Sequence, residues 1–305
     1  MASGTSKSDH GTDARAVRTA AQARRIVKQR GLDHVKVGVF DADGVLRGKF
    51  MAVEKFFSAL DPSGEDGGFG FCDVVLGWDS ADQLYDNTSY TGWHTGYPDA
   101  RVRILPDSCR DQPFDFDGRG LLFLGEFMGT AEAICPRGLL RRMVARAQDM
   151  GLAARAAFEY EFFLFDETPE SAAAKGYRDL QPITPGNFGY SLLRASTWSD
   201  FHGALLQACQ DMDFPLEGLH TETGPGVLEA SIDKDQALAA ADKAALFKTF
   251  AQVVAPRPGL MATFMAKWSP DYPGPSGPIH LSLANIKGGH SAFYDPTAQG
   301  GVSPV

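Results

Sequence analysis

The chain contains 305 residues, of which 44% are hydrophobic and 22% are charged, and its formal net charge is −9. This length is enough for two domains with buried cores. The negative charge, together with the absence of a long lysine and arginine run, argues against a nucleic-acid surface, and no apolar run reaches membrane-spanning length. The four cysteines are scattered without a C-x-x-C pair, which favours a reducing, cytoplasmic setting.

Local patterns in the first half predict a tail, a helix and several strands. Residues 1–14 are polar, so we expect a disordered tail that contains no secretory signal. Alanines at helical spacing predict a helix over 16–30 that ends at Gly31. The segment 61–98 is rich in glycine, aspartate and aromatics, and we expect it to be mostly loop. Strands are predicted at 35–40, 45–51, 102–105 and 121–127.

The second half mixes helices and strands without a regular βαβ alternation. Pro136 is a typical first helical residue and opens a helix that reaches about Met150. Two more helices are predicted over 198–212 and 236–253. The pattern favours the α+β class. We expect an N-terminal domain over 15–130 and a second domain over 131–305.

The segment Phe158-Glu159-Tyr160-Glu161-Phe162-Phe163 is the most informative part of the chain. On a strand, Glu159 and Glu161 point to one side and the aromatic residues point to the other. The aromatic side can enter a core, whereas paired carboxylates need a counter-charge if they are buried. Hard oxygen ligands of this kind suit Mg²⁺ or Mn²⁺, although a solvated acidic face would show the same alternation.

The same pattern recurs in two later segments. Glu222 and Glu229 flank a Gly-Pro-Gly turn, and Glu229 alternates with the aliphatic residues of its strand. His280 and Ser282 share one side of a strand whose other side is aliphatic. A lone histidine on a strand is more often structural than a ligand. Three strands with apolar backs and polar fronts nevertheless predict a sheet that lines a cation-binding cavity.

These motifs, in this order, resemble the glutamine synthetase family. The segments that carry the resemblance run from the opening hairpin to the last histidine strand: Val39–Lys49, Cys135-Pro136-Arg137, Glu159–Phe163, His220–Glu229 and Ser276–Leu283. The resemblance implies a β-grasp-like N-terminal domain followed by a catalytic α+β domain with a largely antiparallel sheet. It extends from about Val35 to the end of the chain.

The family resemblance also implies a reaction and a set of partners. ATP phosphorylates the γ-carboxylate of glutamate, and ammonia or a small amine then displaces the phosphate, with divalent Mg²⁺ or Mn²⁺ stabilising the phosphoryl charge. The segments around Trp78 and Trp93 look more like the amine-using relatives than the ammonia-using enzyme. Family members form rings in which neighbouring subunits complete each other's sites, so a homo-oligomer is expected.

By position in the motifs, the resemblance assigns roles to individual residues. Glu161, Glu222 and Glu229 would hold one metal ion, and Glu159 would hold the second. Glu217, His280 and Ser282 match positions near the nucleotide. Asp79 matches the aspartate that takes the ammonium proton, although Asp73, Asp82 and a plain surface role for Asp79 remain alternatives. Five aromatic residues could line an amine pocket or pack at the interface between the two domains: Trp78, Tyr85, Tyr90, Trp93 and Tyr97.

Two positions depart from the family pattern. Pro278 stands where the family has a metal-binding histidine, and Val227 stands where it has a glutamine. Family members also continue well beyond the position of Val305, where arginines bind phosphate and substrate. We therefore expect little ligase activity and weakened assembly from these 305 residues alone. The alternative function is a non-catalytic or regulatory protomer that binds metal or nucleotide.

Overall fold

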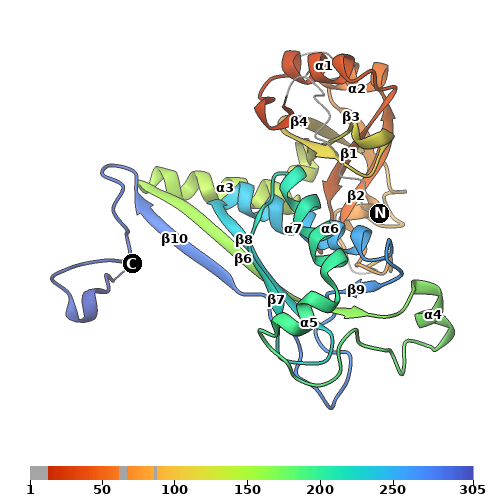
Figure 1. Cartoon of the computed structure of the whole chain (residues 1–305). Coiled ribbons are helices and arrows are strands. Elements are labelled where there is room, and N and C mark those ends of the chain that lie inside the picture. The colour runs from red at the N-terminus through yellow and green to blue at the C-terminus, as the bar shows by residue number, and fades with distance from the viewer. Residues whose placement is uncertain (1–12, 62–66, 86–87, 305) are drawn as a thin grey trace. The chain divides into compact units, whose positions relative to one another are not determined.

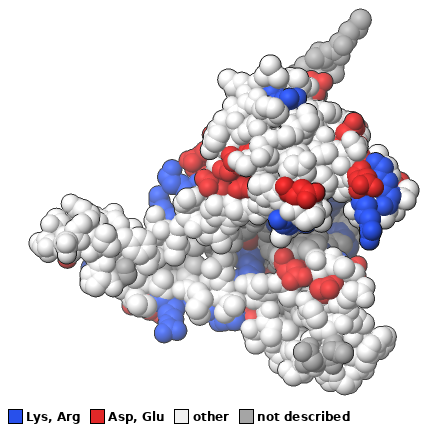
Figure 2. All heavy atoms as spheres, turned by 90° about the horizontal axis from the view of Figure 1, so that it is seen from below, with Lys and Arg blue, Asp and Glu red and all other residues white. Residues whose placement is uncertain are grey.

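The computed structural model describes residues 13–61, 67–85 and 88–304, and the chain divides into two compact units, Met1–Leu140 and Arg141–Val305. Most of the predicted tail lies outside the described residues. Asp13 caps a 3-10 turn, η1 (Ala14–Ala16), and Ala14 is fully buried. Among the described residues, no helix is both long and apolar enough to cross a bilayer. Acidic and basic side chains are interspersed on the face shown in Figure 2.

The first unit combines one mixed sheet with short helices (Figure 1). The predicted first helix begins later than its alanine pattern indicates, because Thr19 and Gln22 form a capping box that starts α1 at Ala20. Gly31 has a φ of +60° just beyond its end. The helices and strands after η1 are α1 (Ala20–Gln29), β1 (His34–Phe40), β2 (Leu46–Ala52), α2 (Val53–Ala59), β3 (Phe69–Cys72), η2 (Asp73–Leu76), β4 (Asp99–Gln112), η3 (Phe116–Gly118), β5 (Gly120–Phe127) and η4 (Gly129–Ala133).

The strand order of this sheet is β2-β1-β5-β4-β3. β1 pairs antiparallel with β2 through the predicted hairpin and parallel with β5. β4 is longer than the predicted segment, because its pairing with β5 continues after a register shift between Leu105 and Arg110. Pro106 lies inside this irregularity, where a missing amide hydrogen breaks no ladder bond. The sheet and its helices bury a core that includes Val35, Phe56 and Phe123.

The second unit is built on an antiparallel sheet in the order β10-β6-β8-β7, with β9 pairing to β6. The α+β class and the largely antiparallel sheet are confirmed, and the predicted helices are present within about a residue. α3 crosses from the first unit into the second. The elements from α3 onward are α3 (Pro136–Asp149), β6 (Leu152–Phe165), α4 (Pro169–Ala174), α5 (Leu192–Thr197), α6 (Ser199–Asp211), β7 (Leu216–Thr221), β8 (Val227–Gln236), α7 (Ala237–Val254), β9 (Met261–Thr263), β10 (Ile279–Asn285) and η5 (Gln299–Gly301).

Aromatic packing fixes one face of the second sheet. Tyr160 stacks on Phe247 of α7 at 5.9 Å between ring centroids, and Phe162 stacks on Phe264 at 5.3 Å. Phe162 and Phe247 are fully buried. Because side chains alternate along β6, this packing leaves its carboxylates on the opposite face.

β10 is the edge strand of this sheet, and its apolar side is not covered. Ile279 is 62% exposed and Leu281 is 54% exposed. The sequence pattern predicted an apolar back on this strand, and the residues do alternate as expected. However, α7 packs on β6 and β8, and Ile279 and Leu281 of β10 remain exposed. The alternating sequence of β10 therefore predicted which side is apolar but not whether that side is buried.

Candidate metal and substrate site

Two carboxylates of β6 lie on the same face of the sheet, as the alternation predicts. Glu161 stands directly opposite Glu229 on β8, and Glu159 stands opposite Ser231. All of these side chains are half-buried. Like charges directly opposite each other destabilise a strand pair, so the Glu161–Glu229 pairing calls for a cation.

A histidine and a third carboxylate extend this row onto β7. His220 pairs with Glu229 across the strands, and Glu222 follows the end of β7. His220 Nε2 lies 3.5 Å from Glu229 Oε1, and His220 Nδ1 lies 3.7 Å from Glu222 Oε2. Each of the three residues offers one ligand atom, and these atoms lie within 4.8 Å of one another. The sheet register thus gathers three potential metal ligands.

The Gly-Pro-Gly turn places Glu222 beside Glu229. Gly224 and Gly226 have φ values of +132° and +70°, a region that favours glycine. A Cβ on Gly226 would lie 2.6 Å from the Leu164 carbonyl oxygen. The turn closes when the Glu222 amide donates to the Val227 carbonyl at 3.0 Å. The backbone amide of Thr223 also donates to Glu222 Oε1 at 2.8 Å, which fixes the carboxylate.

The described side chains that pair with the carboxylates of this site include histidines but neither lysine nor arginine. Within the described part of the chain, no lysine or arginine pairs with Glu159, Glu161, Glu222 or Glu229. Burial raises the pKa of Glu229, and the neighbouring carboxylates raise it further, while His220 opposes the shift. A divalent cation would remove this repulsion, and the oxygen and imidazole donors fit Mg²⁺ or Mn²⁺.

Glu159 has a separate set of neighbours on the β10 side. His280 Nε2 lies 3.2 Å from Glu159 Oε2, and the Ser231 hydroxyl donates to Glu159 Oε1 at 3.3 Å. The Glu159 amide donates to the Pro278 carbonyl at 3.1 Å. The carbonyl of Pro278 is therefore used in a backbone hydrogen bond, and its ring offers no ligand atom.

Two residues predicted near the nucleotide are not gathered into this cluster. Glu217 sits at a register shift of β7, is exposed, and pairs with Lys234 at 3.6 Å. Ser282 lies opposite Arg155 further along β10 and is exposed. The residue that the sequence interpretation left without a role is His220, whose ring stacks on Tyr190 at 4.3 Å. Its position two residues before Glu222 was the available signal, because residues i and i+2 share a face.

The three candidate aspartates of the first unit have different environments. Asp79 Oδ1 accepts hydrogen bonds from the amides of Ala81 and Gln83 at 2.8 and 2.9 Å. Asp82 forms an ion pair with Arg47 at 2.6 Å. The carboxylates of Asp79 and Asp82 therefore both have partners within their own part of the fold.

Asp73 instead lines a cavity of about 430 Å³. It is 3% exposed, and the Thr91 hydroxyl donates to its Oδ1 at 2.6 Å. Of the five aromatic residues predicted for an amine pocket, Tyr90 lines this cavity, whereas Trp93 is 82% exposed. The cavity has the size of a small-ligand site, and its lining residues are Asp73, Tyr90, Pro98, Asp99, Ala100, Arg101, Met128, Gly129 and Thr130.

Comparisons with known proteins place the second unit in a family. A family profile described as "Glutamine synthetase, catalytic domain" matches residues 133–305. Type-1 glutamine synthetase 2 of Dictyostelium discoideum is 40% identical over 274 residues, which cover 89% of this chain and 51% of that protein. A glutamate–isopropylamine ligase of Pseudomonas sp is 33% identical over 289 residues, covering 93% of this chain and 61% of that protein.

A solved structure shares the fold at lower sequence similarity. GmaS in complex with ADP superimposes with a TM-score of 0.73 and 21% identity, over 92% of this chain and 60% of that one. The chain therefore spans between 51% and 61% of the length of these three relatives.

Proposed function

The chain belongs to the glutamine synthetase family, and we propose that it acts as an ATP-dependent ligase that joins ammonia or a small amine to the γ-carboxylate of glutamate. The observation that carries the proposal is the row of carboxylates and imidazole across β6, β8 and β7, with which no described lysine or arginine pairs. A cluster of this composition suits a reaction that moves a phosphoryl group between two anions.

The proposed metal site uses four side chains of the second sheet. His220, Glu222 and Glu229 offer ligand atoms within 4.8 Å of one another. Glu161, directly opposite Glu229, would join Glu222 and Glu229 in holding one Mg²⁺ or Mn²⁺ ion. Glu159 would contribute to a second ion beside His280. When bound, such ions neutralise the transferring phosphoryl group and orient it. The Ser276 hydroxyl donates to Glu161 and holds that carboxylate in place.

For the nucleotide, we propose His280 and Ser282 on the exposed edge strand β10. We also propose Glu217 for the nucleotide from its motif position; its carboxylate pairs with Lys234. For the wider setting, we propose a homo-oligomer, as the resemblance implies, and a cytoplasmic location in line with four free cysteines.

For the amine we propose Asp73 in place of Asp79 or Asp82. An arriving ammonium group must lose a proton before its nitrogen lone pair can attack the acyl carbon. A buried carboxylate that lines a cavity can accept that proton. Tyr90 and Met128 supply an aromatic and an apolar wall, which suits a small organic ammonium ion.

The test measures phosphate release from Mg²⁺, ATP, glutamate and either ammonia or isopropylamine. From these 305 residues we expect slow release that requires glutamate and that Glu229→Gln abolishes. Glu170→Gln should preserve it, because Glu170 is an exposed carboxylate outside the site. Phosphate release that does not depend on glutamate, or that persists in Glu229→Gln, would contradict the proposal.

A second candidate function is a metal- and nucleotide-binding protomer without ligase turnover. The observation that favours it is Pro278, which offers no ligand atom beside Glu159. Such a protomer would release no phosphate in this assay. Calorimetry would still detect binding of Mn²⁺ and ATP.

A further inference from the structure

A compact loop follows the helical turn that carries Asp73. We call residues 78–84 the Trp78 loop; Trp78 and Leu84 form a β-bridge at its base. The Asp79 amide donates to the Gln83 carbonyl at 3.0 Å, and the Asp82 amide donates to the Asp79 carbonyl at 3.1 Å. The loop is thus internally hydrogen-bonded, and Asp79 acts as its internal cap.

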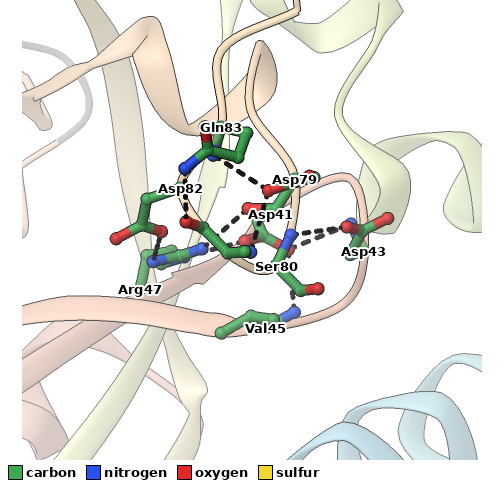
Figure 3. A network of polar contacts seen from close by, with 9 residues as sticks. Asp41, Asp43, Val45, Arg47, Asp79, Ser80, Asp82 and Gln83 are labelled. Carbon is green, nitrogen blue, oxygen red and sulfur yellow. Dashed lines mark hydrogen bonds and ion pairs between the residues drawn. The ribbon is translucent and has the colours of Figure 1, made fainter. Parts of the chain in front are cut away.

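The side chain of Arg47, on β2 of the neighbouring hairpin, contacts this loop (Figure 3). Its Nη1 lies 2.6 Å from Asp82 Oδ1, and its Nη2 donates to the Asp79 carbonyl at 3.3 Å. Its guanidinium carbon lies 4.7 Å from the centroid of the Trp78 ring. One side chain therefore contacts the loop at three of its residues.

On the hairpin side, Asp41 connects Arg47 to the backbone of the turn through hydrogen bonds. Arg47 Nε donates to Asp41 Oδ2 at 2.7 Å, and Asp41 is fully buried. Asp41 Oδ1 accepts from the amides of Asp43 and Val45 at 3.0 and 2.8 Å. Burial alone would lower the pKa of Arg47, but its hydrogen bonds to Asp41 and Asp82 outweigh burial and raise it. The guanidinium therefore remains charged between the hairpin and the loop.

The loop is linked to Asp73 indirectly, through Gly77 at its base and then through Thr91. Gly77, which precedes Trp78, accepts a hydrogen bond from the Tyr85 amide at 2.9 Å across the base of the loop. Gly77 also packs against Thr91, since a Cβ added to it would lie 2.6 Å from Thr91 Cγ2. Thr91 is the residue whose hydroxyl donates to Asp73. Displacing the loop would therefore disturb the only hydroxyl that orients the buried carboxylate in the described structure.

We propose that Arg47 is a positioning residue for the amine cavity, acting through the Trp78 loop and Thr91 on Asp73. This inference rests on the proposed function of that cavity. Charge alone does not meet the requirement, because the contact uses three guanidinium nitrogens and a planar face against Trp78. A lysine offers one compact ammonium group in their place.

The experiment compares wild type, Arg47→Lys and Arg25→Lys in the full chain; Arg25 is an exposed arginine on α1 of the same unit. Hydrogen exchange is measured at the Ala81 and Gln83 amides, and binding of isopropylammonium chloride is followed by NMR shifts of Tyr90 and Thr91. We expect Arg47→Lys to speed exchange and weaken ammonium binding by roughly tenfold each, as for loss of one charged hydrogen bond. Mn²⁺ binding and the Arg25→Lys control should match wild type.

Asp82→Asn provides a milder variant, since Asp82 has an exposed side chain and its loss strands no buried charge. We expect it to produce a smaller change in the same direction. If hydrogen exchange at the loop amides is unchanged in Arg47→Lys, the claim that Arg47 stabilises the loop is wrong. Faster exchange with unchanged ammonium affinity would overturn the positioning role alone. A wild-type protein that binds no isopropylammonium would overturn the cavity assignment, and the positioning role with it.

Discussion

One group of carboxylates in each unit shows a contrast in how negative charge is compensated. In the first unit, Asp41 and Glu126 are fully buried, and each has an arginine partner: Arg47 for Asp41, and both Arg103 and Arg137 for Glu126. In the second unit, Glu161 and Glu229 face each other across two strands without any described lysine or arginine beside them.

This difference distinguishes carboxylates that stabilise the fold through arginine partners from carboxylates that are available to bind a cation. A buried carboxylate with its arginine is electrically complete, and removing either partner strands the other. A carboxylate row without a cation is incomplete until one binds, and it carries a cost in the unliganded fold. The contrast therefore favours the second sheet, and not the acidic network around Arg47, as the proposed site for divalent ions.

Removing Glu126 should give the largest stability effect. Glu126→Ala leaves Arg103 and Arg137 without their shared carboxylate, at 3.1 and 2.7 Å in the native protein. We expect the free energy of unfolding to fall by about 3–5 kcal/mol, measured by urea denaturation. Glu54→Ala, an exposed change in the same unit, should alter it by less than about 0.5 kcal/mol. Equal losses of stability in the two variants would show that Glu126 is not a structural carboxylate.

Glu229→Gln should behave in the opposite way. Because the folded protein raises the pKa of Glu229, its ionised form destabilises the unliganded fold at neutral pH. The neutral amide should therefore leave metal-free stability unchanged or improved. Mn²⁺ at about one hundred times its Kd should stabilise wild type by about 2.7 kcal/mol and the variant far less, in thermal melts with and without EDTA. A strongly destabilised metal-free variant would show that this carboxylate is structural too.

Calorimetric titration with Mn²⁺ tests the cluster at a second position. Glu222→Ala should weaken binding by at least about tenfold, or 1.4 kcal/mol, since it removes one of three ligand atoms gathered within 4.8 Å. The exposed Glu170 again provides a matched control. Identical affinities for wild type and Glu222→Ala would refute the assigned site.

Pro278→His should produce a smaller gain. Residues 278 and 280 share a side of the edge strand, and His280 Nε2 already lies 3.2 Å from Glu159. A second imidazole there should tighten binding of the Mn²⁺–ATP complex by several-fold, on the order of 1 kcal/mol, in an equilibrium nucleotide-binding assay. The variant keeps the carbonyl that accepts the Glu159 amide. No change in affinity would mean that a ligand at 278 cannot serve this ion.

Glu167 should give the smallest effect, and it sharpens the comparison from within the second unit. Hydrogen bonds from Lys175 and Ser171 hold the pKa of Glu167 below its usual value. A lowered folded pKa stabilises the protein above the unfolded pKa, and this contribution is lost as the pH falls through the folded value. Glu167→Gln should therefore differ from wild type at neutral pH and converge with it in acid. A constant difference across an acid titration of stability would contradict the pairing.

The sequence by itself determined the features that depend on short-range periodicity. Alternation placed Glu159 and Glu161 on one face and Tyr160 and Phe162 on the other, because strand side chains repeat every two residues whatever the strand pairs with. The Gly-Pro-Gly turn before Val227 was equally readable, since its glycines supply backbone angles that other residues avoid. The family motifs extended these local patterns to the α+β architecture.

Tertiary structure decided the features that depend on long-range pairing. The β6–β8–β7 register set Glu229 between Glu161 and His220 and so added an imidazole to the predicted carboxylates. Asp73, Asp79 and Asp82 are indistinguishable as sequence letters, and only packing buried Asp73 against a cavity while enclosing Asp79 in its own loop. The apolar side of β10 followed the same rule as that of β6, yet it is exposed because burial depends on a covering element. Strand register, and the packing of other elements on a sheet face, depend on segments far apart in the chain. Local sequence periodicity therefore cannot predict them.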